Sequence, residues 1–195
     1  MSSTVTSPTS QTSEAAPAAP ASAATPTATP ASAATPVAAR RFRSIAGRFT
    51  TGVVAVTARR ASDGAPVGLA VNSFTSVSLE PPLVLFCAAR TSTSWPDVRS
   101  ADRFCVNILG EGQRMLSTRF ATSGAEKFSG VPWTPSPGGA PVLDGSIGWI
   151  ECSVEEEIPA GDHTVVLARV HDLDASEEDS PLVFFRGLYG RYAQL

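Results

Sequence analysis

Apolar side chains alternate with small or polar ones in several short runs, which are separated by glycine, proline or hydroxyl-rich turns. Val67, Leu69 and Val71, for example, repeat with the period of two that is typical of a half-buried strand. Similar runs predict strands at about 53–58, 67–73, 82–89, 104–109, 148–156, 164–172 and 182–185. Because only short helices separate them, a doubly wound parallel sheet does not fit. The pattern favours a mainly β fold, an antiparallel barrel in which closure removes exposed edges.

Three short helices are also predicted. One of the hydroxyl residues at 92–94 can cap a helix that has Pro96 in its first turn and ends near Ser100. Another helix is expected at about 113–120, before a Gly/Pro/Trp-rich excursion from Gly130 to Pro141. The first helix is predicted from apolar residues at roughly helical spacing, namely Val37, Phe42, Ile45 and Phe49. It is amphipathic and ends near Gly47 or Gly52.

The first 39 residues differ in kind from the rest. They are almost wholly Ala, Pro, Ser and Thr, with Glu14 as their only charge. Frequent prolines forbid a helix, and the apolar area is too small to offset the entropy of ordering. We therefore predict a disordered arm over 1–39 and one folded domain over 40–195, long enough to bury a proper core. The arm is interpreted as a solubilising extension, with a docking tether as the alternative.

The charge and cysteine content of the chain limit its possible binding partners and cellular compartment. The 195-residue chain has a net charge of −3 and no basic run beyond 40–43, which argues against nucleic acid. No apolar run approaches the roughly 20 residues of a membrane span, and no cleavage site follows the Arg40–Arg41 pair, so we expect no membrane contact and no export. The chain has three cysteines, Cys87, Cys105 and Cys152, and they form no CxxC motif. We therefore predict buried thiols in a reducing cytoplasm.

A row of short hydrogen-bonding side chains lies between two predicted strands, in the stretch PVGLAVNSFTSVSLEPPLVL at 66–85. An unmet buried donor or acceptor costs about 1–3 kcal/mol. Water could satisfy these groups in an ordinary loop, but a flat ligand rich in hydrogen-bonding groups would satisfy them better. The row consists of Asn72, Ser73, Thr75, Ser76 and Ser78.

Common catalytic motifs are absent from the sequence. It contains no GxGxxG that opens a helix, no P-loop, no nucleophile elbow and no HExxH. With His163 and His171 as the only histidines, a histidine-rich metal site is excluded, and we expect no metal. An enzyme with so few catalytic groups would take its reactivity from a cofactor.

Six segments between about residues 40 and 189 occur in the order found in one family: RFRSIAGRFTTGVVAVT, VNSFTSVSLEPPLVLFC, RFCVNIL, EKFSGV, GDHTVVLARV and PLVFFRGLY. They resemble the short-chain flavin reductases, the NAD(P)H:flavin oxidoreductase partners of two-component flavin monooxygenases. The resemblance implies the FMN-binding split barrel, with FMN or FAD as the flavin and NADH, or alternatively NADPH, as the reductant. It also implies a homodimer and a separate flavin-dependent oxygenase as partner.

The resemblance further implies which residues contact the flavin. Gly68 would permit close approach of the backbone to the ring. At 93–94, a helix start offers free N–H groups to a phosphate with Arg90 nearby, although plain capping is the alternative. Arg119 and Phe120 could instead simply close a helix. The implied set is Pro66, Val67, Gly68, Leu69, Ala70, Asn72, Ser73, Cys87, Ala88, Ala89, Thr93, Ser94, Arg119 and Phe120.

A second set is implied for the nicotinamide nucleotide. The GDH triplet makes His163 the catalytic candidate beside the nicotinamide, although such a histidine is often a structural hydrogen-bonder. Arg186 could pair with the pyrophosphate, and the neighbouring aromatic side chains could stack on a base or ring. The set is His163, Phe184, Phe185, Arg186 and Gly187, while His171 is expected at the surface.

The leading interpretation is a reductase that supplies reduced flavin to a partner monooxygenase. A non-catalytic flavin-binding module is the alternative, but it would not need His163 or the 184–187 segment. An oxidase of a pyridoxamine-type substrate would need a denser basic phosphate clamp than this sequence offers.

Overall fold

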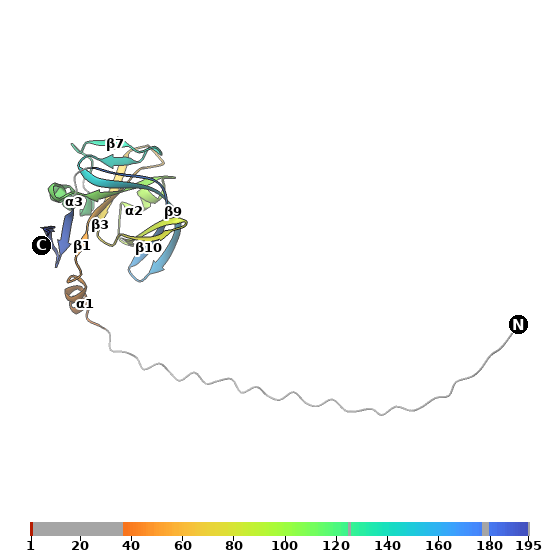
Figure 1. Ribbon diagram of the computed structural model, residues 1–195, viewed down its shortest axis with the longest axis horizontal. Helices are drawn as coiled ribbons and strands as arrows, with labels where there is room; N and C mark the ends of the chain where they lie inside the picture. The colour runs from red at the N-terminus through yellow and green to blue at the C-terminus, as the bar shows by residue number, and fades with distance from the viewer. Residues whose placement is uncertain (2–36, 125, 177–179, 195) are drawn as a thin grey trace, which may run out of the picture. The chain divides into compact units, whose positions relative to one another are not determined.

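The structure, a computed structural model, describes Met1 and residues 37–124, 126–176 and 180–194 (Figure 1). The arm predicted over 1–39 therefore lies almost entirely outside the described residues. Chain contacts group 37–195 as one compact unit.

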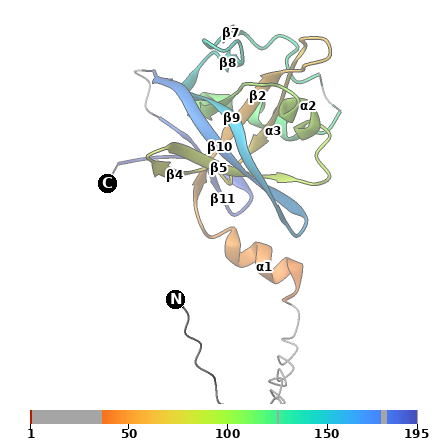
Figure 2. The same cartoon turned by 90° about the vertical axis from the view of Figure 1, so that its right-hand side faces the viewer.

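Seven strands form the main sheet, and every ladder in it is antiparallel. The order is β3-β2-β6-β9-β10-β5-β4, so a mainly β, antiparallel fold is confirmed. The long hairpin of β9 and β10 crosses the middle of the barrel (Figure 2). The bounds are β2 Val54–Arg59, β3 Pro66–Val71, β4 Thr75–Leu79, β5 Pro82–Ala89, β6 Phe104–Leu109, β9 Ser146–Ala160 and β10 His163–Ala175.

Two small sheets accompany the barrel. One contains β1 (Thr51–Gly52), β11 (Leu182–Phe185) and β12 (Leu188–Arg191), and the other pairs β7 (Trp133–Pro135) with β8 (Pro141–Leu143). The sequence analysis missed β1, β4, β7, β8 and β12. Hydroxyl side chains made β4 look like a crossing, and β7 and β8 are three-residue strands rich in proline.

Helices are short and lie where the pattern placed them. They are α1 (Ala39–Ala46), α2 (Trp95–Arg99), a 3-10 turn η1 (Glu111–Gln113) and α3 (Arg114–Ala121). Among the candidate caps of α2, the Ser92 hydroxyl accepts a 3.1 Å hydrogen bond from the Trp95 backbone N–H. No helix in the described part of the chain is both long enough and apolar enough to cross a membrane.

Aromatic rings fill the barrel interior. Phe86 meets Trp95 and Phe104 edge-to-face, with ring centroids 5.4 and 6.0 Å apart. Cys152 is fully buried in the same interior, whereas Cys105 is fully buried on the other face of β6, beside Ser136, and burial raises the pKa of each thiol to about 12. Both therefore stay protonated and unreactive at neutral pH, as the sequence predicted, whereas Cys87 is only half-buried.

One buried polar network connects two barrel strands to β8. The Asn107 amide donates to the Ala55 carbonyl (3.1 Å) and the Thr57 hydroxyl (2.9 Å), and its oxygen accepts from Leu143 N–H (2.8 Å). Thr57 in turn donates to the Pro141 carbonyl. Because the Asn107 and Thr57 side chains are fully buried and bonded, they fix β8 against the barrel.

Gly68 in β3 is required by packing within the chain. A Cβ at this position would lie 2.7 Å from the Val56 carbonyl oxygen and 2.8 Å from the Phe120 ring. The glycine thus allows β2 and α3 to approach β3, which is a different reason from the ring approach that we expected.

We expect Gly68→Ala to lower the free energy of unfolding by about 1–3 kcal/mol, because the added methyl overpacks the core. Gly190→Ala is the matched control, since a Cβ at that strand glycine meets no atom within 4 Å. Urea unfolding of both variants measures the difference. Equal losses in the two variants would contradict this account.

Candidate functional site

β3, at one end of the strand order, lies beside β5 at a seam, and the short strand β4 at the other end pairs with only part of β5. β4 pairs with β5 as far as Leu85. Beyond that point, the Ser73 hydroxyl accepts a 2.8 Å hydrogen bond from the Cys87 backbone N–H and lies 3.4 Å from the Cys87 carbonyl oxygen. A single side chain therefore takes the place of a strand ladder here, and the barrel is split along this line.

A cavity of about 360 Å³ opens at the seam, within the size range of small-molecule sites. Its walls come from β3, β5, the loop before α2, the end of α3 and the first residue of β10. It brings together ten of the residues predicted from the sequence, namely Leu69, Ala70, Asn72, Ser73, Cys87, Ala89, Thr93, Ser94, Phe120 and His163.

The remaining predicted flavin residues lie elsewhere. Pro66, Val67 and Gly68 line a second cavity that adjoins the first. Ala88 is buried in the barrel core, as the alternation along β5 requires. Arg119 is exposed and donates a 2.6 Å hydrogen bond to the Ser129 carbonyl, outside the walls of either cavity.

The segment predicted for the nicotinamide nucleotide is only partly at the seam. Phe184 lines a small cavity of about 120 Å³ that shares Asn72 with the seam cavity. Phe185, Arg186 and Gly187 form the β11–β12 turn, where both Arg186 and Gly187 have positive φ (52° and 81°). Positive φ at both residues of a two-residue hairpin loop is the geometry of the common type I′ turn, so the φ of Arg186 follows from the turn itself.

Lys127 is the residue that the sequence analysis missed. Its ammonium donates to the Ser94 hydroxyl (2.8 Å), the Phe120 carbonyl (2.9 Å) and the Gly68 carbonyl (3.0 Å). Burial lowers its pKa. Two signals could have revealed it: it lies in the quoted EKFSGV segment, and it is the only lysine of the chain.

The polar end of the cavity is built around Ser94. Because Ser94 Oγ accepts a hydrogen bond from Lys127, its own O–H is free to point toward a ligand. Arg90, expected as the charge partner here, is instead near the β9–β10 loop, where its Nη1 lies 3.4 Å from the Gly161 carbonyl oxygen. The cation beside Thr93 and Ser94 is therefore Lys127.

His163 lies at another part of the cavity wall, directly after the two-residue loop of the β9–β10 hairpin. Gly161 takes a φ of 64°, which this loop needs at its first position. The His163 Nδ1 is 2.8 Å from Asp162 Oδ1, and this contact lowers the pKa of Asp162, with a smaller contribution from the Arg43 charge. With Nδ1 occupied, Nε2 is the ring nitrogen left for a ligand.

The row of hydroxyl and amide side chains is less buried than we expected. Asn72, Thr75 and Ser76 are exposed, and Thr75, Ser76 and Ser78 belong to the edge strand β4, away from the cavity walls. The premise of five buried polar groups was therefore wrong. Ser73 keeps the predicted importance, since it bridges the seam.

These features limit the chemistry of the site. In the described part of the chain, no three His, Cys, Asp or Glu side chains are placed to hold a metal ion. The cavity offers hydroxyls, backbone groups, one cation and one imidazole, which suit binding and orientation better than acid–base work. Fold and site together define a split barrel with a seam cavity for a flat ligand that carries an anionic group.

Comparison with known proteins agrees with this class. Residues 46–193 match the flavin reductase like domain, and the chain belongs to that family. It is 47% identical over 150 residues to the reductase subunit HsaB of a flavin-dependent monooxygenase from Rhodococcus jostii, covering 77% of this chain and 76% of that one.

Solved structures show the same likeness. A nitrilotriacetate monooxygenase component B homologue from Mycobacterium thermoresistibile superposes with a TM-score of 0.75 at 44% identity, over 79% of this chain and 86% of that one. The NADH:FAD oxidoreductase SgcE6 from Streptomyces globisporus also gives 0.75, at 32% identity, over 85% and 99% of the two chains. The predicted split-barrel family is therefore confirmed.

Proposed function

We propose that residues 40–195 form an NAD(P)H-dependent flavin reductase that supplies reduced FMN or FAD to a separate monooxygenase. The observation that carries this proposal is the seam cavity, which has Lys127 and Ser94 on one part of its wall and His163 on another. Bound flavin would supply the hydride-accepting ring. The reductase subunit that this chain resembles supports the role of an oxygenase partner.

The residues of the cavity fit a flavin. Leu69 and Ala70 offer an apolar wall for the ring, while Ser73 and neighbouring backbone groups offer donors and acceptors for its polar edge. Ser94 would donate to the flavin phosphate, with the Lys127 charge behind it. Hydride transfer requires two rings in contact and no proton donor from the protein, which agrees with the scarcity of titratable groups.

His163 would orient the nicotinamide. Asp162 fixes the imidazole so that Nε2 can bond the carboxamide of NADH or NADPH at the open part of the cavity. Phe184 and the Arg186 turn would contact the rest of the nucleotide. A module that only holds flavin has no need of either feature.

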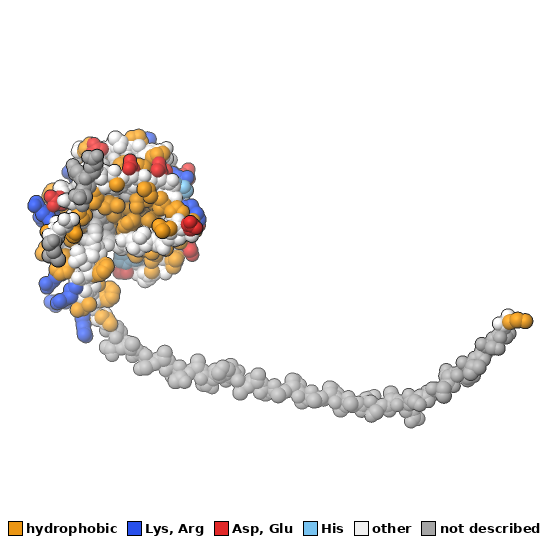
Figure 3. Space-filling view, viewed as in Figure 1, with side chains coloured by type: hydrophobic (Ala, Val, Ile, Leu, Met, Phe, Trp, Pro, Cys, Tyr) orange, Lys and Arg blue, Asp and Glu red, His pale blue; other side chains and the backbone are white. Residues whose placement is uncertain are grey.

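We also propose that the reductase is a homodimer. Phe42, Ile45 and Phe49 lie on one face of α1 and the turn after it, and each is more than 60% exposed. In Figure 3 orange hydrophobic side chains and blue basic side chains lie next to one another in the region of α1. The Arg186 N–H donates to the Gly47 carbonyl (2.8 Å), which joins the β11–β12 turn to the end of α1. A second copy would cover the apolar face of α1 together with exposed Leu188 on β12.

Cysteine chemistry supports a cytoplasmic location. All three cysteines are free thiols, and Cys105 and Cys152 are buried too deeply to be exposed to oxidants. Such thiols are typical of proteins that work in reducing compartments.

Lys127→Met should weaken FMN binding by about 10- to 100-fold, because a charge-assisted contact to the phosphate is lost. Binding of riboflavin, which has no phosphate, should change far less, and flavin fluorescence quenching measures both.

The affinity of the wild-type protein for FMN should also fall as the pH rises through the lowered pKa of Lys127. In the Lys127→Arg variant the side chain keeps its charge, so this fall should be absent. Equal losses for riboflavin and FMN would show that Lys127 only supports the fold.

His163→Ala should leave the Kd for FMN nearly unchanged and raise the KM for NADH about 3- to 10-fold, the cost of one lost hydrogen bond. The control is His171→Ala, which removes an exposed histidine bonded to Ser153 (2.8 Å). NADH oxidation with added FMN or FAD gives the kinetic values. Flavin binding without any NADH turnover by the wild-type protein would favour the non-catalytic module.

Ile45→Asp should convert the dimer to a monomer, because a charge at the centre of the apolar face prevents its burial. Met115→Asp on α3 is the control, since Met115 is 77% exposed and lies outside this surface. Light scattering after gel filtration gives the mass. A wild-type protein that runs as a monomer at micromolar concentration would contradict the proposal.

A further inference from the structure

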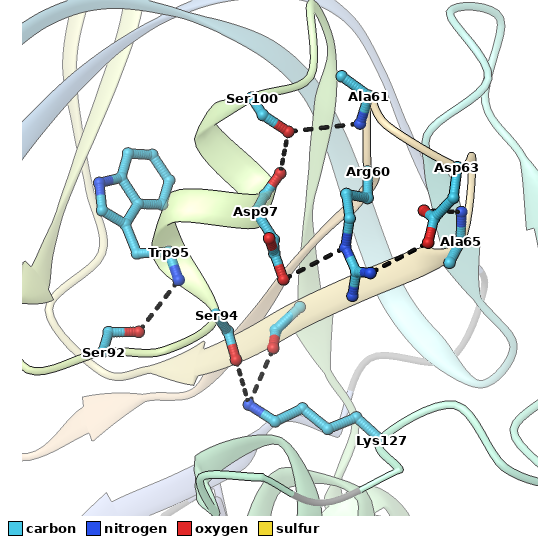
Figure 4. Close-up of polar contacts among 11 residues, drawn as sticks. Arg60, Ala61, Asp63, Ala65, Ser92, Ser94, Trp95, Asp97, Ser100 and Lys127 are labelled. Atoms are coloured by element: carbon cyan, nitrogen blue, oxygen red, sulfur yellow. Dashed lines mark hydrogen bonds and ion pairs between the residues drawn. The ribbon is translucent and has the colours of Figure 1, made fainter.

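Ser94 and Lys127 form a hydrogen-bonded pair in the wall of the seam cavity. The Lys127 Nζ lies 2.8 Å from the Ser94 Oγ, and both residues also line a second cavity of about 650 Å³. Figure 4 shows the Lys127 side chain extending to the Ser94 hydroxyl. A serine hydroxyl held against an amine beside open space can act as a nucleophile when the amine is able to accept its proton.

The Ser94 hydroxyl is not used to cap the helix that it precedes. Ser94 is the N-cap residue of α2, a position where a serine side chain normally accepts a hydrogen bond from the first turn. Its side chain makes no such bond, and the Ser92 hydroxyl accepts from the Trp95 N–H instead. Within the described residues, the contact with Lys127 is therefore the one hydrogen bond of the Ser94 side chain.

Lys127 differs from the neighbouring cation in the charge of its partners. Arg60 is held by two carboxylates, with its Nη1 3.0 Å from Asp63 Oδ2 and its Nε 3.3 Å from Asp97 Oδ2 (Figure 4). The acceptors of Lys127 are two carbonyl oxygens and one hydroxyl, and no carboxylate pairs with it in the described part of the chain. Loss of its proton therefore leaves no carboxylate unpaired, and burial already lowers its pKa.

The direction of the neutral amine is fixed by its three partners. An amine has two hydrogens and one lone pair, and the carbonyl oxygens of Gly68 and Phe120 can only accept. The two hydrogens therefore go to these carbonyls, at 3.0 and 2.9 Å, and the lone pair faces the Ser94 Oγ. The hydroxyl then donates to Nζ, which is the contact between a nucleophile and its base, with the base itself oriented by further groups.

We propose that Ser94 is a nucleophile with Lys127 as its general base, and that the pair hydrolyses small carboxylic esters that enter the seam cavity when it holds no flavin. Ser94 Oγ attacks the ester carbonyl carbon while its proton passes to Lys127 Nζ. The ester C–O bond breaks, and the alcohol leaves with that proton. Water then attacks the acyl carbon and passes a proton through Lys127 to Ser94 Oγ, and the carboxylic acid leaves.

The walls of the seam cavity favour an ester with a flat aryl leaving group. Leu69 and Ala70 offer an apolar wall beside the pair, in a space of about 360 Å³. The Ser94 backbone N–H makes no hydrogen bond within the described residues, so it is available as a donor to the oxyanion. Flavin bound as proposed above would bring its phosphate to Ser94 and keep Lys127 charged, so flavin and ester would exclude each other.

The test treats the flavin-free full chain with an alkyl fluorophosphonate, which reacts with nucleophilic serines, and locates the adduct by peptide mass spectrometry. The adduct should form on Ser94, and saturating FMN should prevent it. Lys127→Arg should slow the labelling about 100-fold, the low end of what a positioned base contributes, because a guanidinium stays protonated. Retained FMN binding by this variant shows that its cavity is intact.

Ser123→Ala is the matched control for the labelling. Ser123 is an exposed hydroxyl of the same cavity wall and makes no hydrogen bond to Lys127 in the described part of the chain. This variant should be labelled at the rate of the wild type.

Hydrolysis of para-nitrophenyl acetate measures turnover, and Ser94→Ala gives the background from imidazoles and the N-terminal amine. The Ser94-dependent rate should rise as the pH rises through the lowered pKa of Lys127, because the base must be unprotonated, while FMN affinity falls over the same range. Lys127→Arg should remove this rate at every pH, which separates Lys127 from the other charged or titratable groups of the two cavities. These groups are Cys87 and His163 in the seam cavity and Arg60, Asp97 and Glu126 in the second.

Three results would overturn the inference: no adduct on Ser94 in a protein that binds FMN, an adduct on Lys127 itself, or equal labelling of the wild type and Lys127→Arg. In each case the reductase function would stand. A protein that is labelled at Ser94 but binds neither FMN nor FAD would instead overturn the proposed reductase function and leave the Ser94–Lys127 pair in place.

Discussion

The barrel is not closed by backbone pairing between β3 and β5, and the site depends on this constraint. A hydrogen-bonded ladder there would have left no cavity, because paired strands lie too close together for a ligand to enter. Ser73 bonds the backbone of Cys87 where a ladder would otherwise run. It holds the edges together at one point while the space beside it stays open. The sheet order, with β3 and β4 at its ends, makes this the natural place for a ligand.

Lys127 holds the other side of this opening. Its three acceptors belong to β3, to the residue before α2 and to the C-terminal end of α3, so one ammonium group joins the three elements that form the polar end of the cavity. Two of the acceptors are carbonyl oxygens, and one of these, from Phe120, lies in the last turn of a helix, where a cation is favoured. The same contacts that order the walls also place a positive charge at the end of the cavity.

Residue pattern predicted most of the strands and helices, whereas the ten predicted residues that line the seam cavity came from the family resemblance. Alternation and turn residues located the long strands and the helices, because burial on one face leaves a clear period in the sequence. The edge strand β4 was missed since its outward hydroxyls resemble a loop. Lys127 was missed for a different reason. Its position depends on a side-chain contact with Ser94, more than 30 residues away, and no local pattern encodes this contact.

The site therefore combines two kinds of polar group with different tasks. Asn107 and Thr57 are fully buried, fully bonded and outside the walls of the seam cavity, so their hydrogen bonds stabilise the barrel. Ser94 and His163 are each bonded on one side only, Ser94 by Lys127 and His163 by Asp162, which leaves the other side of each group directed to a ligand. A protein that borrows its reactivity from a bound ring needs this second kind of group. The ring supplies the chemistry, and the chain supplies donors whose direction is fixed before the ligand arrives.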